Sequence, residues 1–315
     1  MDALIFLGRY PGSVPQPLIE CVPNFSEARN AGTLSKIRQA IRSIAGTLLL
    51  GQESDPDHNR SVFTLAGPPA AVLESAIRAA VVAAQLIDLT QHRGVHPRIG
   101  AADVIPFIPW KGASLSDCAS LANQAAEQIW QRAQVPSYLY EFAARRPERT
   151  NLEAIRKLGF DELLKRPDLP PDVGGPLLHP TAGACAIGAR RILIACNVNL
   201  ATNDLAIAKR MAKAIRASSG GFPYVKALGL ALPSKGVVQV SMNLTHYQVT
   251  PLACVFQRIR DEAPIHSTEI IGFPPQAALT GAEDFLAICE LWSPGRILEN
   301  RIAELTKSAG QADPM

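Results

Sequence analysis

The sequence predicts a mixed α/β protein made of two tandem units. Short apolar runs alternate with longer segments of helical periodicity, and the order strand, helix, strand, strand, helix, strand occurs twice along 315 residues. Apolar residues make up 47% of the chain and charged residues 19%, which is enough apolar material for a sizeable core. We therefore expect an α/β (α+β) fold of two ferredoxin-like βαββαβ sandwiches, with mixed sheets and helices on the outer faces.

The first unit is expected over residues 17–191, after an irregular extension at residues 1–16. The apolar stretch within that extension is too short for a secretory signal or a membrane span. A basic and then proline-rich segment at 142–172 predicts a helical connector followed by an irregular linker. The strands and helices of this unit are predicted at 17–22, 29–44, 47–51, 60–66, 69–88, 102–108, 114–132 and 136–140.

The second unit is expected over residues 192–315. Its alternating and helical patterns repeat the order of the first unit, although no residue-level repeat is evident. Its elements are predicted at 191–199, 202–218, 224–232, 236–243, 250–263, 267–272 and 275–291.

Charge and cysteine usage exclude several classes of protein. The net charge is +3 and is spread along the chain, so we expect no nucleic-acid partner and, without a long apolar segment, no membrane. The six cysteines form no Cys-x-x-Cys pair, and four lie in apolar runs. We therefore expect buried, reduced thiols in a cytoplasmic protein instead of a disulfide framework.

The segment Gly94–Asp103 carries the strongest chemical signal. Pro97 restricts the backbone of His96 to a shaped turn, and flanking glycines permit unusual conformations. An imidazole held there is suited to act as a general base. A structural turn histidine, bonded to the backbone, is the alternative.

A second polar cluster, Glu53–Arg60, lies between two predicted strands. Turn formation explains its Asp-Pro-Asp sequence, and the alternative is a carboxylate beside a cationic reacting group or a partner that orients His96. No metal site is expected, because the chain has no HExxH or full calcium-loop pattern.

Two further segments combine turn residues with polar side chains. Gly174–Gly183 is either a plain hinge or a glycine-rich loop that lets a flat ligand approach the backbone. Asn24 ends the first strand, and Asn243 shares a strand face with Gln239 and Ser241.

Taken together, these segments resemble the formiminotransferase domain family. The resemblance spans roughly residues 17–292 and is carried by Glu20–Glu27, Asn59–Val62, Gln85–Asp88, Gly94–Pro109, Val135–Tyr140 and Val240–Leu244. It implies a one-carbon group transferase that moves the formimino group of N-formimino-L-glutamate to N5 of tetrahydrofolate in histidine degradation. Tetrahydrofolate would be a co-substrate, no metal would be needed, and the protein would be a homodimer.

The resemblance also implies roles for individual residues. His96 would be the catalytic base, with Glu53, Asp55 or Asp57 as the carboxylate that stabilises the cationic reacting group. Substrate and folate would contact Asn24, Asp57, Asn59, Arg60, Arg98, Gly174, Gly175, Pro176, Leu177, Leu178, His179, Pro180, Thr181, Ala182, Gly183 and Asn243. Ala182 stands where the family can have an aromatic residue. A formyl donor, or folate binding without catalysis, are the alternative functions.

Overall fold

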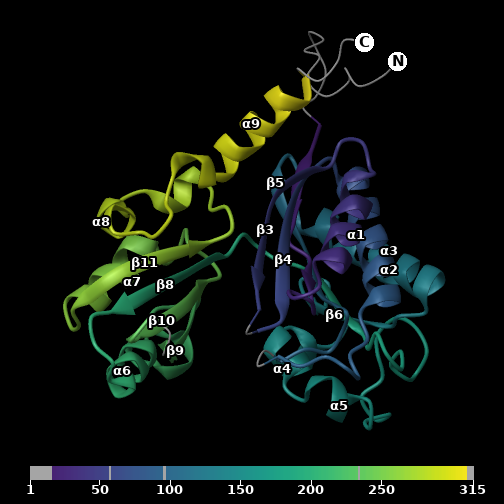
Figure 1. Cartoon of the computed structure of the whole chain (residues 1–315), viewed down its shortest axis with the longest axis horizontal. Coiled ribbons are helices and arrows are strands. Elements are labelled where there is room, and N and C mark those ends of the chain that lie inside the picture. Colours follow the sequence, from purple (N-terminus) through teal and green to yellow (C-terminus); the bar gives the residue numbers. More distant parts are fainter. Residues whose placement is uncertain (1–15, 57, 95–96, 233–234, 311–315) are drawn as a thin grey trace. The chain divides into compact units, whose positions relative to one another are not determined.

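The computed structural model describes residues 16–56, 58–94, 97–232 and 235–310 (Figure 1). The chain divides into two compact units, one ending at Arg190 and the other running over Arg191–Ser308. The mixed α/β character predicted from the sequence is confirmed in both.

The first unit is built on a seven-stranded sheet, as far as the described residues show. Its strands are β1 (Leu18–Cys21), β2 (Asn24–Phe25), β3 (Leu48–Asp55), β4 (Arg60–Gly67), β5 (Ala102–Lys111), β6 (Ser137–Glu141) and β7 (Cys185–Ala189). The strand order is β1-β4-β2-β5-β7-β6, β3 pairs with the free side of β4, and β1 also pairs with β5. Only the pairs of β7 with β5 and β6 are parallel; the others are antiparallel.

Three long helices, α1 (Ala31–Arg42), α2 (Pro69–Leu86) and α3 (Leu115–Ala133), lie side by side on one face of this sheet (Figure 1). Asn30 caps α1, and Ser114 and Asp117 form a capping box at the start of α3. The apolar sides of the helices and the strand residues facing them form one continuous core. Glu20 and Asn24 lie on the opposite face of the sheet, and both are buried.

Helix α2 is long and apolar enough to cross a membrane by length and composition alone. The buried apolar side chains of one side of α2, from Val72 to Ala83, belong to the core. On the other side of the helix, Glu74 and Arg78 form an ion pair. The core helices of soluble proteins can be equally long and apolar, so α2 is weak evidence for a membrane span.

Between β6 and β7 the chain forms η1 (Pro147–Arg149), α4 (Leu152–Arg156), α5 (Gly159–Leu163) and an irregular stretch. The buried Asp172 carboxylate holds this stretch in place. Its oxygens lie 2.6 Å from Arg149 Nη1 and 2.8 Å from the Leu139 amide nitrogen, which donates to it. The linker is thus fixed to the edge strand β6.

The second unit has a four-stranded antiparallel sheet in its described part, with strand order β11-β8-β10-β9. Its elements are β8 (Ile194–Leu200), α6 (Leu205–Ile215), η2 (Ala217–Ser219), β9 (Val225–Leu232), β10 (Val237–Leu244), α7 (Leu252–Arg260), β11 (Ile265–Ile271), η3 (Gln276–Leu279), α8 (Glu283–Ala287), η4 (Pro294–Arg296) and α9 (Leu298–Gly310). One sheet face, with Cys196, Val198 and Leu200, joins the core formed with α6 and α7. On the other face, β8 and β10 present Asn197, Asn199 and Gln239, whereas β9 presents the exposed Leu228 and Leu230.

The structure corrects three expectations. Strand β3 continues to Asp55 instead of ending near residue 51, because its polar end pairs with Arg60–Phe63. Strands β2 and β7 and helix α9 were not predicted. The helix predicted at 275–291 is two short helices, since Gly281 adopts a φ of +73° between η3 and α8 and interrupts the helical backbone.

Candidate functional site

Strand pairing gathers four predicted site residues on one face of the first sheet. Asn24 and Glu53 both lie opposite Val62 of β4, so their side chains point to the same side. Asp55 lies opposite Arg60, two residues before Val62, and therefore shares that side. The helix-covered side instead holds Phe25 and Phe63, whose rings pack edge to face. Sequence motifs far apart in the chain thus meet on the sheet face opposite α1, α2 and α3.

Arg60 is the central cation of this face. Its Nε donates to Asn24 Oδ1 at 3.0 Å, and its Nη1 lies 3.6 Å from Oδ2 of the buried Asp103. Burial lowers the pKa of Arg60 to about 10, although Asp103 opposes the change. The guanidinium therefore stays protonated at neutral pH and is suited to binding a carboxylate.

The two described carboxylates of the turn differ in their contacts. Asp55 accepts the His58 amide at 2.9 Å, and its other oxygen lies 2.9 Å from His58 Nδ1. Glu53 stands within β3, two residues earlier on the same face. Asp57 lies outside the described residues, so the choice among the three carboxylates stays a prediction.

Asn59 holds the turn to its neighbours. It adopts a left-handed φ of +48°, its Oδ1 accepts the Ala28 amide at 2.9 Å, and its Nδ2 donates to Arg93 O at 3.2 Å. Its carbonyl oxygen lies 3.0 Å from Nε2 of the buried His92, which must donate because a carbonyl only accepts. Burial lowers the pKa of His92, although the hydrogen bond to Asn59 opposes the change.

His96, the predicted base, lies outside the described residues, but its neighbours in the chain are firmly held. A Cβ on Gly94 would lie 2.4 Å from His58 O, so this segment packs directly on the turn. Arg98, which is predicted to bind substrate, uses its Nη2 to donate to the His92 carbonyl oxygen at 3.2 Å. Its role in binding stays a prediction.

The predicted folate segment is anchored at both ends. Gly174 has a φ of +94° and packs on the Trp130 ring, while Gly183 has a φ of +70° and packs on Ile99 O. His179 Nδ1 accepts the Ala182 amide at 3.0 Å, which closes the C-terminal turn. Between these anchors Leu177 is 62% exposed. Packing explains the two glycines, and a ligand contact at the exposed part stays a prediction.

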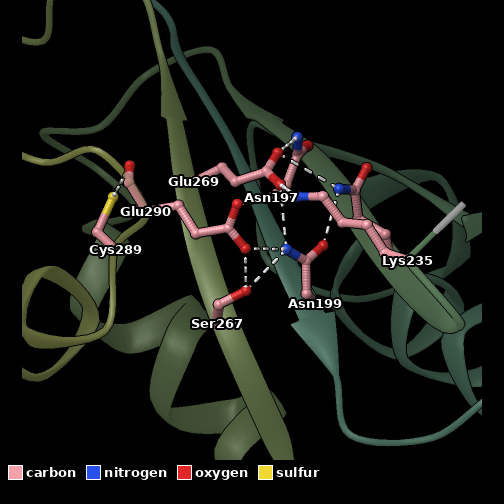
Figure 2. Close-up of polar contacts among 8 residues, drawn as sticks. Asn197, Asn199, Lys235, Ser267, Glu269, Cys289 and Glu290 are labelled. Atoms are coloured by element: carbon pink, nitrogen blue, oxygen red, sulfur yellow. Dashed lines mark hydrogen bonds and ion pairs between the residues drawn. The ribbon is translucent and has the colours of Figure 1, made fainter.

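The second unit carries a polar network on its uncovered sheet face (Figure 2). Lys235 Nζ lies 2.8 Å from both Glu269 Oε1 and Glu290 Oε2. The buried Asn199 donates to Ser267 Oγ at 2.9 Å and to Glu269 at 3.1 Å. Burial alone would raise the pKa of Glu269, but hydrogen bonds from Lys235, Asn197 and Asn199 outweigh it and lower that pKa.

Asn243 lies apart from this network along its strand. It is exposed and pairs with Lys226 of β9 and Ala195 of β8. The buried Gln239 joins the network instead, because its Nε2 donates to Asn199 Oδ1 at 2.9 Å. The alternation of polar residues in β8 and β10 was the signal that could have identified these amides.

Glu20 is a further residue that the sequence reasoning missed. It lies opposite Ala66 in β4, on the same face as Asn24 and Arg60, and is buried. Burial raises its pKa from 4.5 to about 7, with Arg190 opposing the change. Glu20 thus lies on the face of the candidate site, four positions before Asn24, and a buried carboxyl with a raised pKa is often found at functional positions.

Replacing Glu20 with glutamine is expected to flatten the pH dependence of the unfolding free energy between pH 4.5 and about 7. Because the folded pKa is raised, the stabilising effect of the proton is complete below pH 4.5 and is lost as pH rises to the folded pKa. That loss amounts to about 3 kcal/mol in the wild type. Urea unfolding of both proteins at pH 5 and pH 8 measures it. Glu162→Gln, at an exposed site, is the control, and equal slopes for Glu20→Gln and wild type would contradict the prediction.

Potential metal ligands are not clustered in the part of the chain that the structure describes: no group of three or more His, Cys, Asp or Glu side chains could hold one ion. All six cysteines are free, and burial raises the pKa of the Cys118 thiol to about 12.

Comparisons with known proteins cover nearly the whole chain. Residues 18–190 match the family described as formiminotransferase domain, N-terminal subdomain, and residues 195–292 match the formiminotransferase domain. The solved structure of the periplasmic protease PqqL from Escherichia coli aligns with a TM-score of 0.17 and 8% identity over 92% of this chain and 36% of that one, too low for any argument.

Among curated proteins, glutamate formimidoyltransferase of Streptococcus pyogenes serotype M1 is 41% identical over 90% of this chain and 98% of its own length. The protein of the same name from Thermoplasma acidophilum is 41% identical over 90% of this chain and 97% of its length. Mouse formimidoyltransferase-cyclodeaminase is 39% identical over 85% of this chain but only 52% of its own length. Both units match, and relatives of similar length exceed 40% identity, so the chain belongs to the formiminotransferase family.

Proposed function

We propose that this protein is a glutamate formimidoyltransferase. It transfers the formimino group of N-formimino-L-glutamate to N5 of tetrahydrofolate and yields 5-formiminotetrahydrofolate and L-glutamate, a step consistent with histidine degradation. The observation that carries the proposal is the 41% identity to proteins of that name over almost their full length. The shared face of Asn24 and Arg60 supports it, since these two residues come from separate motifs of the resemblance and Glu53 lies on the same face.

The chemistry requires one proton acceptor and one cation-stabilising group. N5 of tetrahydrofolate attacks the amidine carbon, a C–N bond forms, and His96 takes the proton from N5. The tetrahedral adduct then breaks its bond to the glutamate nitrogen, which receives that proton from the imidazolium. A carboxylate from Glu53, Asp55 or Asp57 stabilises the cationic amidine, and the Arg60 guanidinium binds a substrate carboxylate.

Tetrahydrofolate is proposed to bind against Gly174–Gly183. The exposed Leu177 offers apolar surface to a pterin or aminobenzoate ring, while the anchored glycines hold the segment in place. Ala182 is buried, so an aromatic stacking partner would have to come from elsewhere.

We further propose that both units are variants of the ferredoxin-like sandwich. The second unit supports this with its strand, helix, strand, strand, helix, strand order from β8 to β11 and its β11-β8-β10-β9 sheet. In the first unit, β1, β3, β4 and β5 follow the same pairing, and β6 and β7 extend the sheet beyond β5.

The test is turnover by the purified protein with tetrahydrofolate and either formiminoglutamate or formylglutamate. We expect release of glutamate from the formimino donor with a kcat/KM well above that for the formyl donor. Preference for formylglutamate would identify a formyltransferase. Folate binding without turnover of either donor would indicate a binding protein.

Activity is expected to survive exhaustive EDTA treatment and dialysis. The proposed reaction moves protons between nitrogen atoms and an imidazole, so it has no step that requires a Lewis acid. Turnover before and after treatment, at equal protein concentration, is the measurement. Loss of activity that one divalent ion restores would contradict metal independence.

We also propose that the protein is a cytoplasmic homodimer. The family resemblance supports the dimer, and free thiols support a reducing compartment. Sedimentation velocity of the full chain tests the oligomeric state.

A further inference from the structure

The chain directly after His96 is fixed by more contacts than a surface turn requires. Arg156 Nη2 donates to the Pro97 carbonyl, and the Phe160 amide donates to Arg98 O at 2.7 Å. Asp103 Oδ1 accepts the Ile99 amide at 2.8 Å. Three consecutive residues therefore have a backbone group bound by a distant or buried partner.

Arg156 connects two of these contacts. Besides the Pro97 carbonyl, its Nη2 lies 2.9 Å from Asp103 Oδ2. Its side chain is 14% exposed and that of Asp103 is 2% exposed, so both charges are largely removed from water. A buried ion pair is costly to desolvate and adds little net stability. Such a pair at this position is better explained by the geometry it imposes than by stability.

The arginine comes from a different part of the chain. It ends α4, 59 residues after Pro97, and α5, which holds Arg98 O, follows at once. The same carboxylate also faces Arg60, at 3.6 Å. Asp103 thus connects Arg60, the cation proposed to bind substrate, to the backbone segment that follows His96.

We propose that Arg156 is a positioning residue for formimino transfer. Through the Pro97 carbonyl and Asp103, it sets the backbone that carries His96. The proposal rests on the proposed function, in which His96 is the general base. A small displacement of a reacting group, about 1 Å, can lower the rate about 100-fold without changing how substrates bind. Loss of Arg156 should therefore lower kcat and leave KM unchanged.

Arg149 provides a matched control from the same linker. It too is buried, with Nη1 2.6 Å from Asp172 Oδ1 and Nη2 donating to Pro170 O at 2.6 Å. Each of the two arginines therefore pairs with its own buried aspartate and donates to its own proline carbonyl. Only Arg156 contacts the segment after His96. A difference in kcat between the two variants therefore separates positioning from general loss of stability.

The experiment compares wild type, Arg156→Ala, Arg156→Lys and Arg149→Ala in steady-state transfer, with the melting temperature of each protein measured in parallel. For Arg156→Ala we expect kcat to fall about 100-fold, with both KM values within about threefold of wild type. Arg156→Lys keeps a positive charge beside Asp103 but lacks the planar guanidinium with its paired donors. Its kcat should therefore be about tenfold higher than that of Arg156→Ala. Arg149→Ala should melt at a lower temperature and keep kcat within about twofold.

If Arg156→Ala does not fold, Arg156→Lys decides the question, with an expected kcat about tenfold below wild type at unchanged KM. A normal kcat in either folded Arg156 variant would overturn the proposal. So would an equal loss of kcat in Arg149→Ala, or a raised KM with unchanged kcat, which would make Arg156 a substrate-binding residue. A wild-type protein that transfers neither donor would overturn the proposed function itself, whereas an active wild type with an unaffected Arg156→Ala overturns only this inference.

Discussion

Replacing His96 with alanine is expected to lower turnover roughly 10²–10⁴-fold, the range typical of a lost general base. N5 of tetrahydrofolate must lose a proton when it attacks the amidine carbon, and the glutamate nitrogen must gain one when it leaves. One imidazole can serve both steps, because an imidazole can both accept and release a proton near neutral pH. Folate affinity should change little, since the proton transfer takes place after binding.

Steady-state kinetics and calorimetric titration with folinic acid measure the two quantities separately. His266→Ala is the control, because His266 is an exposed histidine on β11 of the other unit. It should leave both turnover and affinity unchanged. Near-normal turnover by a folded His96→Ala protein would remove the imidazole from the mechanism.

The general architecture could be predicted because local patterns determine it. Helices α1, α2 and α3 each bury one side against the sheet, which gives the helical spacing of apolar residues that the sequence shows. Strand β7 could not be predicted in the same way. Its five residues, Cys185–Ala189, are all buried, so they lack the alternation that distinguishes a half-exposed strand. Its parallel pairing with β5 and β6 depends on tertiary structure alone.

The candidate site could likewise be predicted only in part. Asn24, Glu53 and Arg60 stand in short motifs near strand ends, and their types alone suggest chemistry. Their placement on one face follows from pairing, which the sequence does not specify. Arg156 could not be identified, because a lone arginine in a basic linker is ordinary until its contact with Asp103 is seen.

Substitution of Gly183 with alanine is expected to destabilise the first unit by on the order of 3 kcal/mol. The residue has a φ of +70°, which a side chain disfavours, and a Cβ there would lie 2.1 Å from the Ile99 carbonyl oxygen. That oxygen cannot move aside, because it also accepts the Ala184 amide at 2.9 Å. Thermal unfolding should show a drop in melting temperature of roughly 10 °C.

Two neighbouring variants distinguish this structural role from ligand binding. A Cβ on Gly175 would lie 3.3 Å from the Trp130 ring, without a left-handed backbone, so Gly175→Ala should melt close to wild type. Leu177 is 62% exposed, so Leu177→Ala should also melt normally. If folate covers this side chain, its affinity for Leu177→Ala should fall about tenfold, because burial of a leucine contributes about 1.5 kcal/mol or more. Unchanged folate affinity in Leu177→Ala would place the ligand away from the exposed part of this segment, and a Gly183→Ala protein that melts like wild type would contradict the packing argument.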